Sequence, residues 1–301
     1  MQVSIITVNY NSSLHTIAMV DSIRKMTRPE FEYEIIVVDN ASEPDQFELL
    51  SPLHSFPEIK IIRSRLNGGF ASGNMMGVQH AIGEYYLLLN NDTLFTNDVL
   101  STFYKYGQNH PDTGLMTGQL FHENGTRSSS YKKFPALANK LFGNALVRFL
   151  YPNDFPSNKA LLSKPTEVSV VSGSCMFFRR NVFDAVGGLD TVFFLYCEEE
   201  DISKRVRDNG AKVIFLPDAH IIHLEGASTG RNLAIEKEFF ISNRLLLEKH
   251  LPAWQTCIMK YLLLFKLLRR SFRSIHYFRL FLFVLRGAPI KESLRYKQRL
   301  K

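Results

Sequence analysis

Short apolar runs alternate with longer segments of helical pattern over the first 90 residues. Four runs, at 3–8, 34–38, 59–62 and 85–89, have the length of strands and end at polar residues. Segments 12–26 and 71–82 have helical periodicity, and Ser12 or Ser13 suits the N-cap of the first helix. Strands that are apolar throughout are buried on both faces, as in a parallel sheet covered by helices. The pattern therefore predicts an α/β fold with a mainly parallel central sheet.

A second patterned block begins near residue 168. It contains predicted strands at 168–171, 175–178 and 212–215. A short helix is predicted at 181–186 with Asn181 as its cap, and longer helices at 198–209 and 234–251. Between 121 and 166 the pattern weakens into polar and aromatic residues with short helical pieces. We therefore expect a long insertion there, within one folded domain that spans residues 1–251.

Charge divides the chain into two parts. The net charge of +7 comes from 36 basic and 29 acidic residues, but residues 254–301 contain 12 basic residues and one acid, Glu292. This tail carries +11, which leaves 24 − 28 = −4 for the rest. A nucleic-acid-binding domain would carry its basic residues on its folded face, so we expect no nucleic-acid partner. Residues 252–301 are instead predicted to form a separate basic tail.

The tail is also amphipathic. Its basic stripe has helical spacing of i, i+3, i+4 and i+7, with Leu and Phe around the rest of the circumference. These basic residues are Lys266, Arg269, Arg270 and Arg273. Charges also interrupt each apolar stretch, so a membrane-spanning helix is not expected. The pattern favours C-terminal amphipathic helices on an anionic membrane surface. The alternative is a helical hairpin packed on the body or in a homodimer, with a solvated basic face.

The cysteines and the first residues bear on the compartment. Cys175, Cys197 and Cys257 are odd in number and widely separated, so they suit neither a disulfide framework nor a C-x-x-C zinc cluster. The opening residues 1–6 lack the basic segment of a secretory signal. We therefore expect a reducing, cytoplasmic location.

Polar residues follow the predicted strands where each strand ends. Asn9, Asp39, Asn67 and Asp92 all occupy such positions. In parallel α/β sheets, ligands bind beyond the carboxyl ends of the strands. A carboxylate such as Asp92 could bind a divalent cation that bridges to a diphosphate, although strand-end Asp is often only a helix cap.

Four consecutive acids at 198–201 begin a predicted helix, directly after the aromatic segment 193–196. The helix dipole favours acids there, but their mutual repulsion and the aromatic surroundings would raise a carboxyl pKa and suit a general base. A solvated acidic first turn is the alternative. His220 and His223 are by spacing alone more typical of surface or core residues than of metal ligands. The glycine-rich segment 67–74 is not G-x-G-x-x-G, so a dinucleotide site is not predicted.

Taken in order, these motifs resemble those of the family 2 glycosyltransferases, which have the GT-A fold. Segments 4–11 and 35–42 resemble the first two strands of the family, and 67–74 resembles its G-F-A-x-G-N turn. Segment 89–93 is similar to the L-N-P-D-T form of the D-x-D motif in rhamnosyltransferase-like members. Segment 187–205 resembles G-G-F-D-E-x-F-F-x-Y-x-E-D-x-D-L-x-x-R. The resemblance covers roughly residues 2–250.

The resemblance implies a role for each motif. Asp92 and His223 would ligate Mg²⁺ or Mn²⁺, and Glu199 would be the catalytic base, with Glu198 and Asp201 as alternative bases. The residues expected to bind the nucleotide sugar are Thr7, Asn9, Asp39, Asn67, Gly69, Asn74, Asn91 and Asp92. The chain departs from the family pattern at three positions. Asn90 replaces the first acid of D-x-D, Glu199 replaces an Asp, and Met75 replaces a second Asn.

The implied function is that of an inverting, metal-dependent glycosyltransferase of bacterial surface polysaccharide biosynthesis. Its donor would be a nucleotide sugar such as dTDP-rhamnose or a UDP-sugar. Its acceptor would be a glycan or lipid-linked oligosaccharide, faced by the insertion at 121–166. Hydrolysis by two carboxylates is disfavoured because the donor-side residues are expected to bind nucleotide. The location implied is the inner face of the cell membrane, and a homodimer stays open. The alternative function is a non-catalytic nucleotide-sugar-binding or scaffold protein of the same fold.

Overall fold

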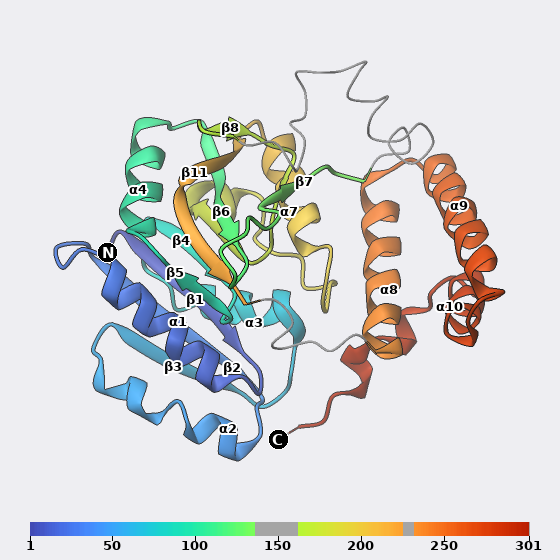
Figure 1. Cartoon of the computed structure of the whole chain (residues 1–301), viewed down its shortest axis with the longest axis horizontal. Helices are drawn as coiled ribbons and strands as arrows, with labels where there is room; N and C mark the ends of the chain where they lie inside the picture. The colour runs from blue at the N-terminus through green and yellow to red at the C-terminus, as the bar shows by residue number, and fades with distance from the viewer. Residues whose placement is uncertain (136–161, 225–231, 301) are drawn as a thin grey trace.

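The computed structural model describes residues 1–135, 162–224 and 232–300. Its main sheet has the strand order β3-β2-β1-β4-β10-β6-β11-β5, and β8 pairs with β11 (Figure 1). The strands of this sheet are β1 Val3–Asn9, β2 Tyr33–Asn40, β3 Ile59–Ser64, β4 Tyr85–Leu89, β5 Thr93–Phe95, β6 Thr113–Phe121, β8 Thr166–Glu167, β10 Cys175–Arg179 and β11 Lys212–His223. A small second sheet pairs β7 Tyr131–Lys132 with β9 Val170–Val171.

Six of the nine strands in the main sheet run in the same direction, although only four of their eight pairings are parallel. Strands β1 to β4 run in one direction, as do β6 and β11. Strand β10 is antiparallel to both β4 and β6, and β5 and β8 are antiparallel to β11. The predicted α/β fold with a mainly parallel sheet is confirmed.

Helices cover both faces of the sheet because successive strand residues point to opposite sides. Ile5 and Val37 belong to the core on the face covered by α1 Ser13–Met26 and α4 Val99–Asn109. Ile6 and Val38 belong to the core on the other face, covered by α3 Gly69–Val78, α6 Arg180–Ala185 and α7 Glu198–Asp208. The short α2 Pro44–Glu48 and the 3₁₀ turn η1 Ser51–Ser55 lead into β3.

Element bounds agree with the sequence prediction where the pattern was strongly apolar. The strands predicted in the first 90 residues and the two helices between them are confirmed to within a few residues. The sequence pattern did not predict α4, β5 or β6, and β6 includes Gly114, Gly118 and Gln119, which interrupt its apolar run. Asn181 lies inside α6 and does not cap it. Residues 136–161 of the expected insertion lie outside the described residues.

Three C-terminal helices stand beside the sheet (Figure 1). They are α8 Leu233–His250, α9 Ala253–Ser271 and α10 Ile275–Leu285, followed by the 3₁₀ turns η2 Ile290–Glu292 and η3 Leu294–Lys297. Their inward apolar residues form a core separate from that of the sheet. This core includes Ile241, Leu264, Leu267, Leu280, Phe283 and Val284. The tail therefore forms a helical hairpin that packs on α8, and its association with a membrane surface stays a prediction.

The basic stripe expected on a single helix is shorter than predicted. Helix α9 ends at Ser271, so Arg273 lies in the connection to α10. Ser274 interrupts the helix, because its extended backbone starts α10 and its hydroxyl caps that helix. Within the described ranges, no helix is both long and apolar enough to span a bilayer.

Candidate functional site

The polar residues at the ends of β1 and β2 meet at one edge of the sheet. In the parallel register of these strands Asn9 lies opposite Asp39, and both side chains are fully buried. The Asn9 amide donates to Asp39 Oδ1 over 2.9 Å, and the Ser42 backbone N–H donates to Oδ2 over 3.2 Å. Arg63 Nε lies 3.7 Å from Oδ2. Asp39 is thus held in one orientation at the carboxyl end of the sheet.

Two further residues predicted to bind nucleotide, Thr7 and Asn91, are buried in the same region. The Asn91 amide donates to Ser12 Oγ over 2.7 Å and to Thr16 Oγ1 over 2.9 Å. It therefore attaches the loop after β4 to the start of α1. The Thr7 hydroxyl has no hydrogen-bond partner among the described residues. Contact of Thr7, Asn9 and Asn91 with a nucleotide stays a prediction.

The glycine-rich turn before α3 contacts the segment that precedes the acidic helix. Asn67 Oδ1 accepts hydrogen bonds from the Asn40 amide and the Gly69 backbone N–H, both over 2.9 Å. The Phe70 backbone N–H donates to the Phe194 carbonyl over 2.8 Å. Gly69 has a φ of +83°, and a Cβ there would lie 2.1 Å from the same carbonyl oxygen. Only glycine fits this contact.

Asn74 lies farther along α3. It is buried there, and its amide donates to the Phe70 carbonyl over 3.0 Å. Its side-chain oxygen has no hydrogen-bond partner among the described residues. A direct contact of Asn74 with the nucleotide sugar also stays a prediction.

Asp92 and His223 lie side by side although 130 residues separate them in sequence. Strand β5 pairs antiparallel with β11 so that His223 is opposite Thr93, the neighbour of Asp92. His223 Nε2 lies 3.2 Å from Asp92 Oδ1. This oxygen is buried and accepts no well-formed hydrogen bond from the described residues. His220 is elsewhere, since its ring packs edge-on against Phe121.

One carboxylate and one imidazole fit part of the ligand set of a divalent cation. Mg²⁺ and Mn²⁺ commonly take one or two protein carboxylates and complete their coordination with phosphate oxygens and water. The part of the chain that the structure describes has no cluster of three or more His, Cys, Asp or Glu suited to a metal. Asp92 and His223 therefore suit a cation that arrives with a diphosphate better than a closed structural metal site.

The first three acids of α7 differ in their pKa. Lys132 on β7 lies with Nζ 2.7 Å from Glu199 Oε1 and 2.5 Å from Glu200 Oε1. Burial alone would raise the pKa of Glu199, but the Lys132 ammonium outweighs it and holds that pKa below its ordinary value of 4.5. Burial and the Glu199 charge raise the pKa of Glu200 to about 7. The same two causes raise the pKa of Glu198 well above its ordinary value. Lys132 thus favours the ionised form of Glu199 more than burial allows for its two neighbours.

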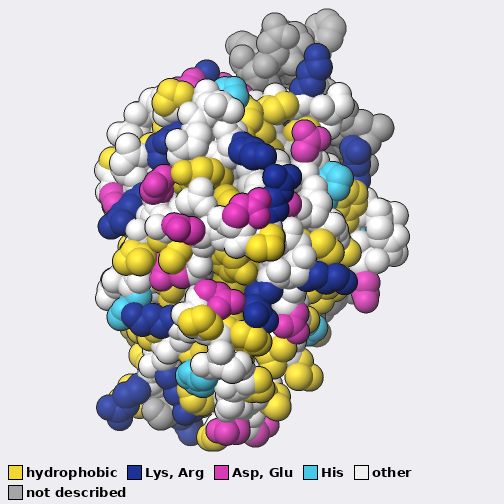
Figure 2. Space-filling view, turned by 90° about the vertical axis from the view of Figure 1, so that its left-hand side faces the viewer, with side chains coloured by type: hydrophobic (Ala, Val, Ile, Leu, Met, Phe, Trp, Pro, Cys, Tyr) yellow, Lys and Arg dark blue, Asp and Glu magenta, His cyan; other side chains and the backbone are white. Residues whose placement is uncertain are grey.

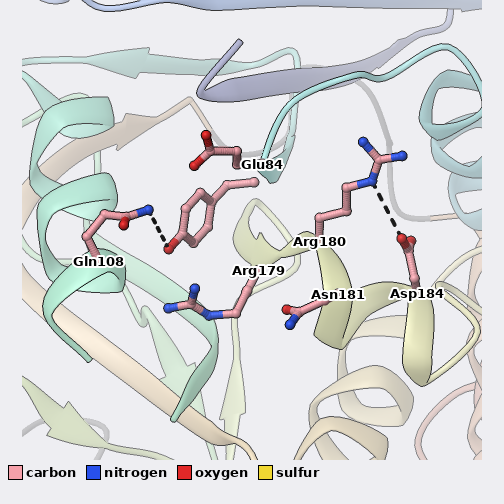
Figure 3. A pocket seen from close by; sticks show the side chains of 7 residues that line it. Glu84, Gln108, Arg179, Arg180, Asn181 and Asp184 are labelled. Carbon is pink, nitrogen blue, oxygen red and sulfur yellow. Dashed lines mark hydrogen bonds and ion pairs between the residues drawn. The ribbon is translucent and has the colours of Figure 1, made fainter. Parts of the chain in front are cut away.

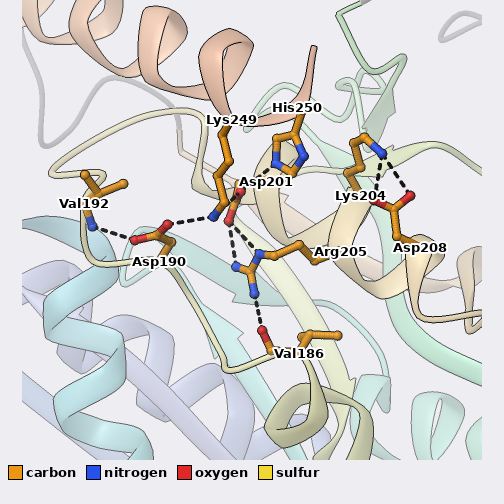
Figure 4. Close-up of polar contacts among 9 residues, drawn as sticks. All are labelled: Val186, Asp190, Val192, Asp201, Lys204, Arg205, Asp208, Lys249 and His250. Carbon is orange, nitrogen blue, oxygen red and sulfur yellow. Dashed lines mark hydrogen bonds and ion pairs between the residues drawn. The ribbon is translucent and has the colours of Figure 1, made fainter. Parts of the chain in front are cut away.

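Asp201, the fourth acid, points toward α8 and is surrounded by cations (Figure 4). Its carboxylate accepts hydrogen bonds from Arg205 at 2.6 and 2.9 Å, and it lies 2.7 Å from both Lys249 Nζ and His250 Nε2. Burial opposes ionisation, but hydrogen bonds from His250 and Lys249 and the Arg205 charge lower the pKa of Asp201 to about 2. Lys249 also bonds Asp190 over 2.6 Å. Asp201 therefore joins α7 to α8.

Glu199 is linked to the strand end that carries Asp92 through the loop before β10. A Cβ at Gly173 would lie 3.6 Å from the Glu199 carboxyl carbon, so this side chain lies against the loop before β10. The Asn90 backbone N–H, directly after β4, donates to the Ser174 carbonyl of that loop over 3.0 Å. The loop thus connects the acidic helix with the D-x-D-like segment.

The backbone just before the acidic helix is strained. Tyr196 and Cys197 have φ values of +73° and +69°, in the left-handed region that non-glycine residues rarely adopt. Such strain persists only where surrounding contacts enforce it, and it is common at functional sites. Here Phe193, Cys197 and Leu246 of α8 form a small apolar cluster that holds the segment.

Two clefts do not include Asp92, His223 or Glu199, although Arg205 and Lys249, which contact Asp201, line the second. The first, of about 350 Å³, is lined by Glu84, Tyr85, Arg179 and their neighbours at the start of β4, the opposite end of that strand from Asp92 (Figure 3). The second, of about 440 Å³, is lined by Met75 and by residues 186–191. The Met75 sulfur accepts a hydrogen bond from the Leu189 backbone N–H over 3.3 Å. The unusual methionine therefore packs against the glycine turn of the 187–205 motif.

Neither Lys132 nor the loop at 172–174 was predicted from the sequence to belong to the site. Lys132 lies in a weakly patterned segment, 67 positions before Glu199. Its role depends on β7 pairing with β9, which places it over the start of α7. Two-residue strands leave no periodicity that could have predicted this pairing.

The comparisons with known proteins agree with the geometry. The model of the family Glycosyl transferase family 2 matches residues 4–187. The chain belongs to this family. It is 22% identical over 244 residues to the N-acetylglucosaminyl-diphospho-decaprenol L-rhamnosyltransferase of Mycobacterium tuberculosis, which covers 76% of this chain and 78% of that protein. It is 28% identical to rhamnosyltransferase WbbL of Escherichia coli, over 64% of this chain and 72% of WbbL. A match to protein y4gI of Sinorhizobium fredii, also 28% identical, covers 68% of this chain but 22% of that longer protein.

Solved structures confirm the GT-A fold. GalNAc-T7, solved with UDP, GalNAc and Mn²⁺, superposes with a TM-score of 0.60 at 16% identity, over 82% of this chain and 48% of that chain. The mannosyltransferase PcManGT of Pyrobaculum calidifontis, in complex with GDP-Man and Mn²⁺, superposes with a TM-score of 0.57 at 17% identity, over 82% and 63% of the two chains. The resemblance inferred from the motifs is thus confirmed at the level of family and fold.

Proposed function

We propose that this member of glycosyl transferase family 2 is an inverting, metal-dependent enzyme that transfers a sugar from a nucleotide-sugar donor to a glycan acceptor. The observation that supports it best is that two groups of side chains are linked at one edge of the sheet. Asp92 and His223 lie side by side where they would hold a cation, and Glu199 lies against the loop that is bonded to Asn90. A donor diphosphate and an acceptor hydroxyl both require such groups.

Glu199 is the preferred base among the four acids of α7. A base must be ionised before it takes a proton, and burial raises the pKa of Glu198 well above its ordinary value, which disfavours its ionised form. Asp201 is ionised, but its bonds to Arg205, Lys249 and His250 occupy its oxygens and make it a very weak base. Lys132 keeps Glu199 ionised and fixes its carboxylate over the loop at 172–174.

The transfer step then follows from direct displacement. Glu199 takes the proton of an acceptor hydroxyl, whose oxygen attacks the anomeric carbon of the donor sugar. The bond between this carbon and the diphosphate oxygen breaks, and the electron pair leaves with the nucleoside diphosphate. Attack opposite the leaving group inverts the anomeric centre. Asp92 and His223 would hold Mg²⁺ or Mn²⁺, which when bound neutralises charge that develops on the diphosphate. Asp39, Asn67, Gly69 and Asn74 would form the nucleotide side of the site.

The rhamnosyltransferase relatives favour dTDP-rhamnose or a UDP-sugar as donor and a lipid-linked oligosaccharide as acceptor. We place the reaction at the inner face of the cell membrane, in surface polysaccharide biosynthesis. A non-catalytic nucleotide-sugar-binding protein of the same fold is the alternative function. Intact Asp39, Asp92 and Glu199 favour catalysis, because a scaffold would not need this set of carboxylates.

A donor screen tests the proposal. Release of nucleoside diphosphate is measured with dTDP-, UDP- and GDP-sugars, each with Mg²⁺, with Mn²⁺ and with a chelator, in the presence of a lipid-linked acceptor. We expect one nucleotide to dominate, release to require the cation, and the product to have the inverted anomeric configuration. Donor binding without turnover under every condition would instead favour the scaffold function.

A further inference from the structure

Helix α9 presents a continuous apolar stripe to solvent. Its inward residues Leu264 and Leu267 are buried against α8 and α10, but its outward positions are large and exposed. They follow one another at steps of four and three residues, which keeps them on one face of the helix. The stripe consists of Trp254, Ile258, Tyr261, Phe265, Leu268 and Phe272.

The exposure of this stripe is extensive. Trp254 is 59% exposed, Phe265 69% and Phe272 84%. Ile275 and Phe278 on α10 are also large, apolar and exposed. Contiguous exposed apolar side chains of this size mark an interaction surface in a soluble protein.

Basic residues border the stripe along one side. Lys266 and Arg269 each follow a stripe residue by one position, a rotation of about 100° around the helix, and Arg273 lies just beyond the end of α9. All three side chains are exposed. Residues 253–286 contain seven basic residues and no acid. On the face of the molecule seen in Figure 2, by contrast, basic and acidic side chains are interspersed.

Such a stripe would suit either a second copy of the chain or a lipid surface, and the charges around it decide between the two. A second copy of the chain, packed stripe to stripe, would bring two strongly basic helices together without acids between them, and the repulsion would oppose a dimer. An anionic lipid surface complements the same charges, and each Lys or Arg near it contributes about 1 kcal/mol. Trp and Tyr among the apolar residues suit the interfacial region between headgroups and acyl chains.

We propose that α9 lies parallel to an anionic membrane surface with this stripe inserted at the acyl boundary and Lys266, Arg269 and Arg273 among the headgroup phosphates. The relevance of this docking to a lipid-linked acceptor rests on the proposed function. Docking itself does not, because it can be measured without donor or acceptor. A chain that binds membranes but transfers no sugar would overturn only the proposed function.

Trp254 reports directly on the stripe because it is the single tryptophan of the chain. The full-length chain is mixed with vesicles of phosphatidylcholine alone or with added phosphatidylglycerol. We expect flotation with the anionic vesicles and a blue shift of tryptophan emission. Brominated acyl chains should quench that emission. Added salt should weaken binding without abolishing it, because salt screens the charges and leaves apolar burial nearly unchanged.

Matched variants distinguish vesicle binding through the stripe from nonspecific hydrophobic binding. Phe265→Ser with Phe272→Ser should weaken vesicle binding by about 100-fold, since each buried Phe adds roughly tenfold or more. The control pair is Leu14→Ser with Ile82→Ser, at positions 68% and 65% exposed outside the C-terminal helices, and should leave binding unchanged. Lys266→Glu with Arg269→Glu should weaken binding by about fivefold or more per residue. Lys25→Glu with Lys105→Glu makes the same charge change on α1 and α4 as its control.

Three results would overturn the docking proposal. The first is equal binding to neutral and anionic vesicles. The second is unquenched Trp254 emission in protein that floats. The third is a dimer in solution that the Phe265→Ser, Phe272→Ser variant converts to a monomer, with no flotation of the parent chain. This last result would assign the stripe to a contact between copies of the chain.

Discussion

Four consecutive acids at the start of α7 occupy four different environments. Each step along a helix turns the side chain by about 100°, so neighbours face different parts of the fold. Glu199 and Glu200 share Lys132, Glu198 is buried, and Asp201 faces the cations of α8 and its own helix. Four residues of similar chemistry therefore acquire different pKa values and roles.

At the metal position, Asp92→Ala should abolish cation-dependent release of nucleoside diphosphate. The carboxylate lies beyond the end of β4 and outside the apolar core, so thermal unfolding should change little. Turnover is measured across a Mn²⁺ titration, and circular dichroism checks the fold. Full activity of the variant would remove Asp92 from the cation site.

For the base, Glu199→Gln should lower kcat by about 10²-fold or more with little change in donor affinity, as expected when a positioned base is lost. Glu198→Gln serves as the neighbouring control. Donor affinity is measured by calorimetry and kcat by nucleotide release. An inactive Glu198→Gln beside an active Glu199→Gln would assign the base to Glu198.

The pH dependence of turnover should depend on Lys132. Because this ammonium holds the pKa of Glu199 below 4.5, the acidic limb of the kcat/KM profile should lie below that pH in the parent enzyme. Lys132→Met removes the charge, so burial raises the pKa of Glu199 and the limb moves to higher pH. Lys132→Arg should restore it. If the acidic limb of the parent enzyme's profile were instead centred near pH 7, the base would be Glu200.

At the scale of elements, the acidic helix is positioned by a turn that precedes a different helix. The Phe194 carbonyl accepts the Phe70 N–H at the start of α3, and Gly69 leaves room for that contact. The strained Tyr196 and Cys197 then direct the chain into α7. The glycine turn thus orients the acidic helix, in addition to its expected place over the nucleotide.

The Gly69→Ala variant tests the contact between the glycine turn and the Phe194 carbonyl. A Cβ there meets the Phe194 carbonyl at 2.1 Å, whereas Gly210 has the same φ of +83° and nothing within 4 Å among the described residues. Left-handed backbone alone costs about 1–2 kcal/mol for alanine, so Gly210→Ala should lose about that much. We expect Gly69→Ala to lose at least about 2 kcal/mol more in urea unfolding and to lower kcat. Equal losses in the two variants would show that the turn does not constrain α7.

At the scale of the whole molecule, the helical C-terminal part is joined to the sheet domain through buried charge. Asp201 contacts Lys249 and His250 of α8, and the Ser242 hydroxyl donates to the Leu195 carbonyl over 2.8 Å. The boundary predicted at residue 251 separates α8 from α9, but both helices contribute to one small core. Point variants of the full chain therefore test the tail better than its removal.

Low pH should weaken the contacts of Asp201 that join α7 to α8 and so lower the free energy of unfolding. The folded pKa of Asp201 is lowered from 3.8 to about 2, so its contribution is fully present above about pH 4 and is lost as pH falls through 2. At neutral pH, Asp201→Asn should lower the free energy of unfolding by roughly 2–4 kcal/mol. Between pH 4 and 2, the free energy of unfolding should depend less on pH in the variant than in the parent chain. Asp208→Asn on the same helix removes an exposed pair and should cost about 0.5 kcal/mol or less. A loss of kcat without loss of stability in Asp201→Asn would contradict a structural role.

Local pattern determined the strands and helices of the first 90 residues, the polar strand ends and the family motifs. Burial on both faces of a parallel sheet leaves apolar runs that a sequence displays directly. Pattern also located the basic, amphipathic tail. Its hairpin form and the exposure of the Trp254 to Phe272 stripe depended on which face of α9 packs against α8.

Only the tertiary structure decided which acid is ionised and which residues meet. Asp92 reaches His223 through the pairing of β5 with β11, and Glu199 meets Lys132 through the pairing of β7 with β9. The hydrophobic periodicity of a sequence shows which positions are buried. It does not show which residue, distant in the sequence, a given side chain will contact. A carboxyl pKa depends on that partner and on its distance. The sequence therefore determined at which edge of the sheet the site lies. The tertiary structure decided the ionisation and the contacts of each side chain in the site.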